Sequence, residues 1–283
     1  MNRNLLGVMQ GRLLPKYKGR YQAHPVGYWQ DEFELASGLG LDLIEWIFDF
    51  NDADINPLSS DAGIRLIREV SAQTGVSVQT ICADYFMEAP LHSANSNTSR
   101  ESLKVLVDLI PRAAKLGVTN IVIPCVDQSK LSDNGARGRF FEAIKQVLPT
   151  AATYRLFLCL ETDLAPEPFR DLLSEIDSPF VTVNYDTGNS ASCGFDPVKE
   201  LAAYGDRITD VHIKDRKLGG SSVALGTGDT KFPEFMRGLQ ARKYKGPFIM
   251  QAYREDEGLK IFEQQLVWAR QLLSEWGFGS LES

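Results

Sequence analysis

The chain has 283 residues, of which 43% are hydrophobic and 24% charged, and its formal net charge is −7. These values are typical of a soluble enzyme with a large buried core. The acidic balance argues against nucleic acid as a partner, since a negative surface repels a phosphate backbone. No apolar run approaches the roughly 20 residues of a membrane span, so we expect no membrane partner.

Eight short runs rich in apolar and β-branched residues predict buried parallel strands. In chain order they cover residues 5–9, 43–47, 76–82, 120–126, 156–161, 180–185, 208–213 and 248–252. Long loops follow the first and third runs, at 10–29 and 83–98. Long loops on a barrel usually belong to its working face.

Amphipathic runs with helical spacing lie between the predicted strands. Residues 99–116 are an example, and Gly117 follows them as a C-terminal stop. Further helices are predicted at 59–74, from Phe232 onward, and at 258–276. Strands and helices that alternate eight times predict an α/β fold of the (β/α)8 TIM barrel class. We expect residues 1–283 to form one such domain.

Four consecutive predicted strands end in or beside a polar residue. These residues are Glu161, Asp186, His212 and Gln251. The C-terminal end of each barrel strand faces the active site, and a buried carboxylate is costly unless it is paired or binds a metal. Three oxygens and one imidazole suit Mn, Mg or Co, and Zn less specifically. We therefore predict one divalent metal ion here, with a hydrogen-bonded polar plug as the alternative.

Three motifs carry a family resemblance. Residues 184–189 read Asn-Tyr-Asp-Thr-Gly-Asn, 211–215 read Val-His-Ile-Lys-Asp, and 226–229 read Gly-Thr-Gly-Asp. Their order and spacing resemble the xylose-isomerase-like sugar-phosphate isomerase/epimerase superfamily, and most of all its L-ribulose-5-phosphate 3-epimerase branch. The resemblance implies one metal ion, often Mn, held by the residues that match Glu161, Asp186, His212 and position 251. It also implies a small sugar or sugar phosphate as substrate and a homo-oligomer.

Position 251 departs from the family, which usually has Glu where this chain has Gln. Two-base epimerisation needs two groups that titrate, and an amide cannot act as a base. Glu161 alone could still move a proton between adjacent carbons through an enediolate, which is aldose–ketose isomerisation. Glu45 and Asp84, at or just after the ends of the second and third predicted strands, are the candidates for a second base.

Further candidate residues lie around the predicted mouth. Lys214 follows the predicted histidine ligand closely and could polarise the substrate, with a salt bridge as the alternative. Arg216, Gly226 and Gly228 belong to the segment after the seventh strand, where barrels often bind phosphate. The glycines could equally serve tight turns. The remaining candidate substrate contacts are Gln10, Glu45, Asp84, Asn189 and Arg254.

Cysteine and histidine usage gives two more expectations. The four cysteines form no close C-x-x-C pair, and residues 1–9 have no apolar run of signal-peptide length. We therefore expect reduced thiols in a cytoplasmic protein. His24 and His92 fall in the two long loops, where a lone histidine is more often on the surface than a ligand.

Three classes of function are compatible with these features. The first is a metal-dependent sugar isomerase or epimerase that uses Glu161 as its base. The second is a hydrolase or lyase on the same barrel, because a fold alone does not fix its chemistry. The third is a sugar-binding barrel without catalysis, which Gln251 favours and the remaining predicted ligands oppose.

Overall fold

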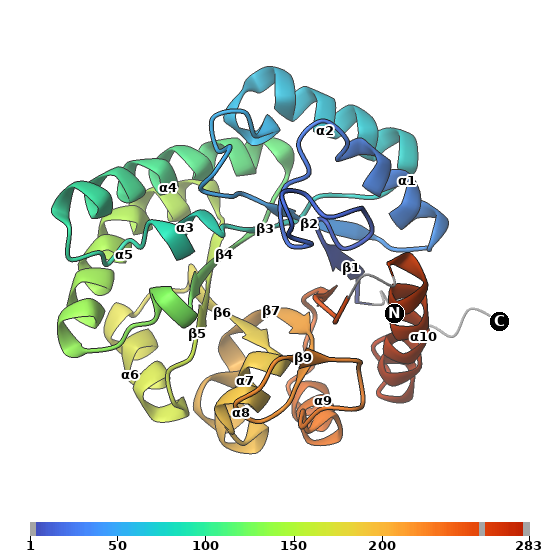
Figure 1. The fold of residues 1–283 in the computed structure, drawn as a ribbon. Coiled ribbons are helices and arrows are strands. Elements are labelled where there is room, and N and C mark those ends of the chain that lie inside the picture. The colour runs from blue at the N-terminus through green and yellow to red at the C-terminus, as the bar shows by residue number, and fades with distance from the viewer. Residues whose placement is uncertain (1–3, 255–257, 280–283) are drawn as a thin grey trace.

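The computed structural model describes residues 4–254 and 258–279. Eight parallel strands close into a barrel in the order β1-β10-β7-β6-β5-β4-β3-β2, and helices surround it (Figure 1). The barrel strands are β1 (Leu6–Met9), β2 (Leu43–Ile47), β3 (Thr80–Cys82), β4 (Asn120–Cys125), β5 (Phe157–Thr162), β6 (Val181–Asp186), β7 (Ile208–Ile213) and β10 (Phe248–Met250). The predicted (β/α)8 barrel is confirmed.

The outer layer consists of eight longer helices. They are α1 (Gln30–Gly38), α2 (Asp61–Thr74), α4 (Ser96–Leu116), α5 (Asn134–Tyr154), α6 (Pro166–Ile176), α8 (Pro197–Tyr204), α9 (Phe232–Ala241) and α10 (Leu259–Glu275). Shorter elements complete the described chain: α3 (Tyr85–Glu88), α7 (Thr187–Cys193), the 3-10 turns Pro57–Ser59, Asp127–Ser129 and Gly205–Arg207, and an antiparallel hairpin of β8 (Asp215–Arg216) and β9 (Ser222–Val223).

Helix α4 and strand β3 are two of the elements whose bounds differ from the sequence prediction. Helix α4 begins at Ser96, earlier than predicted, because the Asn95 side chain accepts hydrogen bonds from the backbone N–H groups of Asn97 and Thr98. Strand β3 is shorter than predicted because its register against β2 shifts. Leu43 pairs with Ser77 in an isolated bridge, 34 positions further along the chain, whereas Trp46 pairs with Ile81 in the ladder, 35 positions further along. One extra residue therefore lies between the two pairings, as in a β-bulge.

Apolar and polar side chains alternate inside the barrel. The apolar cluster consists of Met9, Leu43, Ile47, Cys82, Val122, Cys159 and Ile249. Side chains alternate between the two faces of a strand, so Glu45 shares the inner face with Leu43 and Ile47. Asp210 and His212 share the inner face of β7 in the same way. None of these three polar side chains has measurable exposure to solvent, so the barrel interior buries ionisable groups that need internal partners.

A buried carboxylate holds the long loop that follows β1. Glu32 of α1 accepts hydrogen bonds from the backbone N–H groups of Gly11 at 2.8 Å and Leu13 at 3.0 Å. Between these two positions, Arg12 donates to the carbonyl of Ala252 at 3.1 Å and to the side-chain oxygen of Gln22 at 3.1 Å. The loop is thereby tied across the mouth to the residues that follow β10.

Two further features of the described chain concern its thiols and the length of its helices. All four cysteines are free, and Cys82, Cys125 and Cys159 are buried while Cys193 is exposed. Within residues 4–254 and 258–279, none of the helices combines the length and the apolar character needed to cross a membrane.

The loop anchor at Glu32 predicts a pH-dependent stability. Burial raises the pKa of Glu32 from 4.5 to about 7, although the bonds from Gly11 and Leu13 lower it. Its contribution to stability is therefore fully present below pH 4.5 and is lost as the pH rises through 7. Relative to Glu32→Gln, we expect the unfolding free energy of the wild type to fall by roughly 3 kcal/mol between pH 4 and pH 8.

Urea unfolding of both proteins across that pH range measures this difference. Glu34→Gln, at an exposed position of the same helix, is the control, because it removes a carboxylate and leaves the Glu32 anchor in place. The same pH dependence for both variants would contradict the prediction.

Candidate metal and active site

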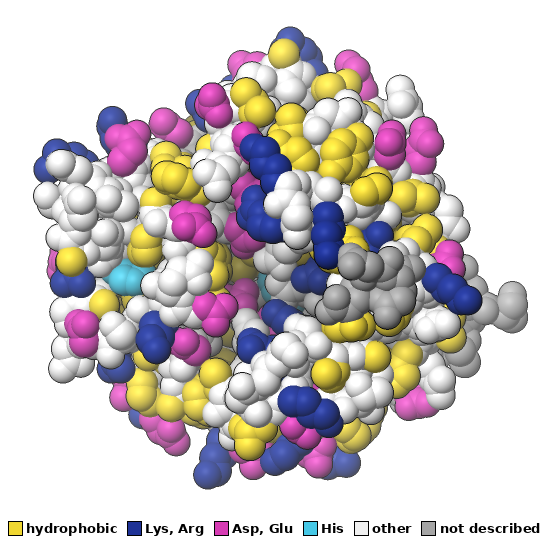
Figure 2. All heavy atoms as spheres, viewed as in Figure 1, with side chains coloured by type: hydrophobic (Ala, Val, Ile, Leu, Met, Phe, Trp, Pro, Cys, Tyr) yellow, Lys and Arg dark blue, Asp and Glu magenta, His cyan; other side chains and the backbone are white. Residues whose placement is uncertain are grey.

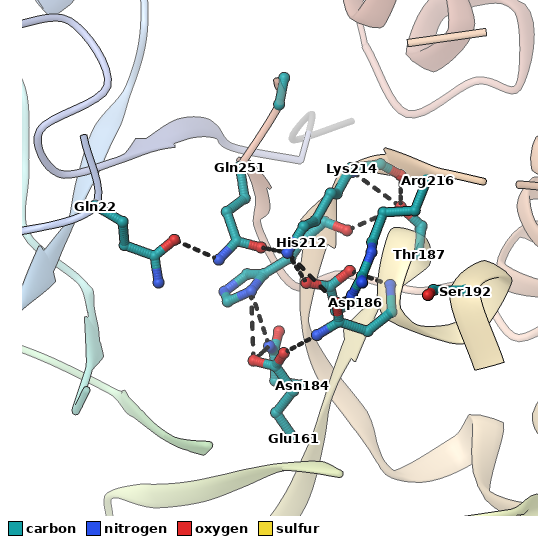
Figure 3. Close-up of polar contacts among 12 residues, drawn as sticks. Gln22, Glu161, Asn184, Asp186, Thr187, Ser192, His212, Lys214, Arg216 and Gln251 are labelled. Atoms are coloured by element: carbon teal, nitrogen blue, oxygen red, sulfur yellow. Dashed lines mark hydrogen bonds and ion pairs between the residues drawn. The ribbon is translucent and has the colours of Figure 1, made fainter. Parts of the chain in front are cut away.

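Three of the four predicted metal ligands meet at the C-terminal mouth of the barrel (Figure 3). Asp186 is the last residue of β6 and pairs in register with His212 of β7, so the two side chains lie at the same height. The ligand atoms of Glu161, Asp186 and His212 all lie within 4.8 Å of one another, and all three residues are buried. The structure therefore brings together the three residues that were selected because they end neighbouring strands.

His212 is held between two carboxylates. Its Nε2 lies 2.7 Å from Oε2 of Glu45, and both side chains are fully buried. Its Nδ1 points the other way, 3.1 Å from Nδ2 of Asn184 and 3.6 Å from Oε2 of Glu161. A carboxylate on one ring nitrogen sets the orientation of the ring and leaves the other nitrogen for a cation. Burial lowers the pKa of His212, but the surrounding carboxylates, Glu45 first, raise it to about 10.

Glu161 has a fixed orientation and a raised pKa. Nδ2 of Asn189 donates to its Oε1 at 2.6 Å, and Nδ2 of Asn184 donates to its Oε2 at 3.0 Å. Burial, followed by the charge of Asp186, raises the pKa of Glu161 to about 7. A carboxyl group in this range can accept and release a proton near neutral pH.

Lys214 connects Gln251 to the acidic cluster. Its Nζ lies 3.1 Å from Oε1 of Gln251, 3.4 Å from Oδ2 of Asp186 and 3.4 Å from Oδ1 of Asn189. The side chain is 14% exposed. The amide oxygen of Gln251 therefore faces the same centre as the carboxylate of Asp186, and the ion pair considered for Lys214 is formed.

These residues fit a divalent cation. Two carboxylates, an imidazole Nδ1 and an amide oxygen are donors that Mn²⁺ and Mg²⁺ accept. The electrostatics point the same way, because the charge of Asp186 contributes to the raised pKa of Glu161. Two buried carboxylates this close together repel each other, and a divalent cation between them would offset that repulsion.

Gln22, from the loop after β1, extends the network to the other side of the mouth. Nε2 of Gln251 donates to Oε1 of Gln22 at 2.8 Å (Figure 3), and this oxygen also accepts from Arg12 at 3.1 Å. Nε2 of Gln22 then donates to Oδ2 of Asp84 at 3.1 Å. A continuous chain of hydrogen bonds thus runs from Lys214 through two amides to Asp84.

A cavity of about 250 Å³ opens above this network. Figure 2 shows the same face hollowed at its centre, with acidic and basic side chains around the hollow. The lining of the cavity includes Glu161, Lys214, Gln251, Asn189, Arg216, Gln22 and Asp84.

The guanidinium of Arg216 donates to Oδ1 of Asn189 at 2.9 Å and to the carbonyl of Gly220 at 3.0 and 2.8 Å. Both acceptors are neutral, so its charge is available to an anionic ligand.

Two predicted substrate contacts have internal partners instead. Oε1 of Gln10 accepts from the backbone N–H of Ile47 at 3.0 Å and lies 3.2 Å from Nδ1 of His24. Glu45 lies beneath His212, as described above. Neither residue is among the described residues that line the cavity, and their contact with substrate stays a prediction.

The glycine-rich segment binds an internal carboxylate. Oδ2 of Asp215 accepts from the backbone N–H groups of Gly226 at 2.9 Å and Gly228 at 2.8 Å, and its Oδ1 accepts from Thr230 at 3.1 Å. A protein carboxylate therefore takes the place predicted for a phosphate group. Arg254 donates to the carbonyl of Arg12 and lies over the ring of Tyr21, 4.6 Å from its centroid.

The expectation that the two loop histidines lie on the surface was wrong. His24 is 2% exposed and packs against Trp46 at 4.9 Å between ring centroids. His92 is 7% exposed and lies 6.0 Å from Phe140. Both loops fold back onto the barrel, and the apolar body of an imidazole packs well against aromatic rings.

Sequence reasoning missed three residues of this site. Asn184 had a signal, because it lies two positions before Asp186 and therefore on the same strand face. For Arg12 and Gln22, the signal was only that they lie in the long loop 10–29. The path of that loop depends on contacts with Glu32 and Ala252, which the sequence does not reveal.

Comparisons with known proteins identify the family of this chain. The family model for the xylose isomerase-like TIM barrel matches residues 33–272. The chain belongs to this family. It is similar to L-ribulose-5-phosphate 3-epimerase UlaE of Escherichia coli (strain ATCC 8739), with 26% identity over 246 residues that cover 83% of this chain and 86% of the relative. The name of that relative agrees with the isomerase class predicted from the sequence.

Solved structures share the fold. One is 3-keto-D-glucoside 4-epimerase YcjR of E. coli in its apo form, with a TM-score of 0.74, 17% identity, and coverage of 95% of this chain and 100% of that one. Another is a xylose isomerase-like TIM barrel protein from Mycobacterium smegmatis in complex with magnesium, with a TM-score of 0.71, 20% identity and 97% coverage of both chains.

The contact between Glu45 and His212 generates a prediction about metal binding. Glu45→Gln keeps the shape of the side chain but removes the charge that orients the imidazole. We expect a loss of about 10- to 100-fold in affinity for Mn²⁺, measured by calorimetric titration. Glu200→Gln is the matched control, because Glu200 is also a buried acid but accepts from hydroxyl groups of Tyr185, Ser190 and Tyr204. Equal affinity in wild type and Glu45→Gln would contradict the assignment.

Proposed function

We propose that this protein is a metal-dependent isomerase or epimerase of a sugar or sugar phosphate, and that it acts through an enediolate. The observation that carries the proposal is the buried cluster of Glu161, Asp186 and His212 on the wall of a polar cavity. The family supports the proposal, since the curated relative named above acts on L-ribulose 5-phosphate according to its name.

Glu161, Asp186, His212 and Gln251 would hold the metal ion. When bound there, a divalent cation would polarise a substrate carbonyl and neutralise the negative charge that develops on its oxygen. The oxygen-rich donor set favours Mn²⁺ or Mg²⁺, with Co²⁺ and Zn²⁺ as alternatives. The magnesium complex of the mycobacterial family member supports a hard cation in this fold.

Glu161 would serve as the general base. Its two oxygens are oriented by Asn184 and Asn189, and it lies on the cavity wall. In this position it would take the proton from the carbon next to the substrate carbonyl. Lys214 reaches into the same cavity as a cation and would donate a hydrogen bond to a substrate oxygen.

Arg216 is our proposed anchor for a phosphate group, in place of the glycine-rich segment. The amides of Gly226 and Gly228 already bind Asp215, whereas the guanidinium of Arg216 has neutral acceptors and lines the cavity. A guanidinium can bind a phosphate through two parallel hydrogen bonds.

A catalytically reduced sugar-binding barrel is the second candidate. The observation that favours it is Gln251, which cannot titrate. A hydrolase or lyase on the same barrel has no such observation in its favour. Metal-dependent turnover of any sugar would exclude a purely binding role.

The proposed base predicts the behaviour of Glu161→Gln. We expect solvent deuterium to enter the wild-type substrate at the carbon next to the carbonyl when Mn²⁺ is present and not after chelation. In Glu161→Gln, this exchange should fall by about 10²- to 10⁴-fold, because an amide cannot accept the proton. Mass spectrometry of a panel of pentuloses, hexuloses and their phosphates measures the incorporation.

The control for this measurement is Asp163→Asn, two positions along the chain and not among the described residues that line the cavity. It should exchange at the wild-type rate. Undiminished exchange in Glu161→Gln would remove Glu161 from its proposed role.

The proposed phosphate anchor predicts a selective effect of Arg216→Ala. We expect KM to rise about 10- to 100-fold for a phosphorylated sugar, because a charged hydrogen bond is lost. KM for the corresponding free sugar should change much less. Lys217→Ala, in the same segment but paired with Asp229 at the surface, is the control. Equal effects on both substrates would show that Arg216 does not read the phosphate.

A further inference from the structure

Inversion of a carbon centre needs a proton-transfer group on each side of that carbon. Glu161 supplies one such group in the proposed function, on which the following inference rests. Position 251 cannot supply the other, since its amide neither gains nor loses a proton in the required range. A second proton-transfer group must therefore come from another titratable side chain near the cavity, or the enzyme cannot epimerise.

Glu45 is excluded by its place in the structure. Its side chain has no exposure to solvent, and its Oε2 is 2.7 Å from Nε2 of His212. It lies below the imidazole, within the barrel, and does not belong to the described cavity lining. A substrate in the cavity would be separated from Glu45 by the ring of His212.

Asp84 has the opposite properties. It follows strand β3, lines the cavity, and is partly exposed there. Its Oδ1 accepts from the thiol of Cys82 at 3.2 Å, and its Oδ2 accepts from the amide of Gln22 at 3.1 Å. Both partners are neutral. Asp49, another acid of this cavity, differs in that it pairs with Arg20 at 3.0 Å.

The setting of Asp84 also suits proton transfer near neutral pH. Burial, followed by the charge of Asp49, raises the pKa of Asp84 to about 6. Its neutral partners do not hold it in the ionised form as an ion pair would. Both protonation states are therefore accessible, as a group that gives and takes a proton requires.

The amide network explains how an acid at 84 is combined with an amide at 251. Oε1 of Gln22 accepts from Arg12 and from Gln251, and this orientation turns its Nε2 toward Asp84. A carboxylate at position 251 would place one of its oxygens next to Oε1 of Gln22, and both atoms are hydrogen-bond acceptors. The amide at 251 thus supports the orientation of Gln22 that positions the carboxyl group of Asp84.

We infer that Asp84 is the second proton-transfer group of this active site, and that the enzyme is a two-base epimerase despite Gln251. Glu161 takes the proton as the C–H bond next to the carbonyl breaks. The protonated carboxyl group of Asp84 then delivers its own proton to the other face of the same carbon, and a new C–H bond forms. Release of one proton from Glu161 and uptake of one by Asp84, both exchanged with solvent, restore the enzyme.

Asp84→Asn in deuterium oxide tests this inference in the Mn²⁺-loaded, full-length protein. The wild type should form the inverted sugar with deuterium at the inverted carbon. The variant should still exchange the substrate proton through Glu161 within a few-fold of the wild-type rate. Its inversion should fall by about 10²-fold or more, because the second face receives no proton. Asp163→Asn should retain both activities.

Asp84→Glu keeps a carboxyl group and should recover part of the inversion, which also decides the case if Asp84→Asn does not fold. Undiminished inversion in Asp84→Asn would overturn the inference. So would an equal loss of exchange and inversion in both variants, which would indicate substrate binding. A wild type that exchanges the proton but never inverts a carbon would overturn it and leave the proposed isomerase intact. A wild type without any exchange would remove the proposed function itself.

Discussion

Buried negative charge at the barrel mouth is the constraint on which the rest of this structure depends. Glu45, Glu161 and Asp186 surround His212, and none of these side chains is more than slightly exposed. A carboxylate leaves water at an acceptable cost only where hydrogen-bond donors or cations replace its hydration. The imidazole and Lys214 provide part of that replacement. The negative charge that these two groups leave uncompensated is the physical reason to expect a metal ion among these residues.

The same constraint accounts for the loop that follows β1. Arg12 is a buried cation whose pKa is lowered to about 10 by burial and raised in part by Asp186 and Asp84. It brings positive charge close to the acids without forming an ion pair with either, since its hydrogen bonds go to Ala252 and Gln22. A loop distant in sequence from the metal ligands therefore takes part in the electrostatics of the site.

The fold and the central cluster could be predicted from the sequence because both follow from local patterns. Apolar runs give the strands, and the strand ends give Glu161, Asp186 and His212 by a rule of barrel geometry. The role of Gly226 could not be predicted in this way, because a glycine pattern does not reveal that Asp215 will occupy its amides. The position of Gln22 could not be predicted for a similar reason, since hydrogen bonds across the mouth decide the path of its loop.

Gln251 shows why one missing acid does not by itself imply lost catalysis. A glutamate there would add another carboxylate beside Asp186 and would meet the amide oxygen of Gln22 as a second acceptor. The glutamine avoids both costs, because its oxygen accepts from Lys214 while its nitrogen donates to Gln22. The proposed second proton-transfer group, Asp84, lies two hydrogen bonds away from Gln251. The directions of these hydrogen bonds thus decide at which position around the mouth an acid can be accommodated. The effect of a substitution at one strand end therefore depends on the residues that its side chain orients.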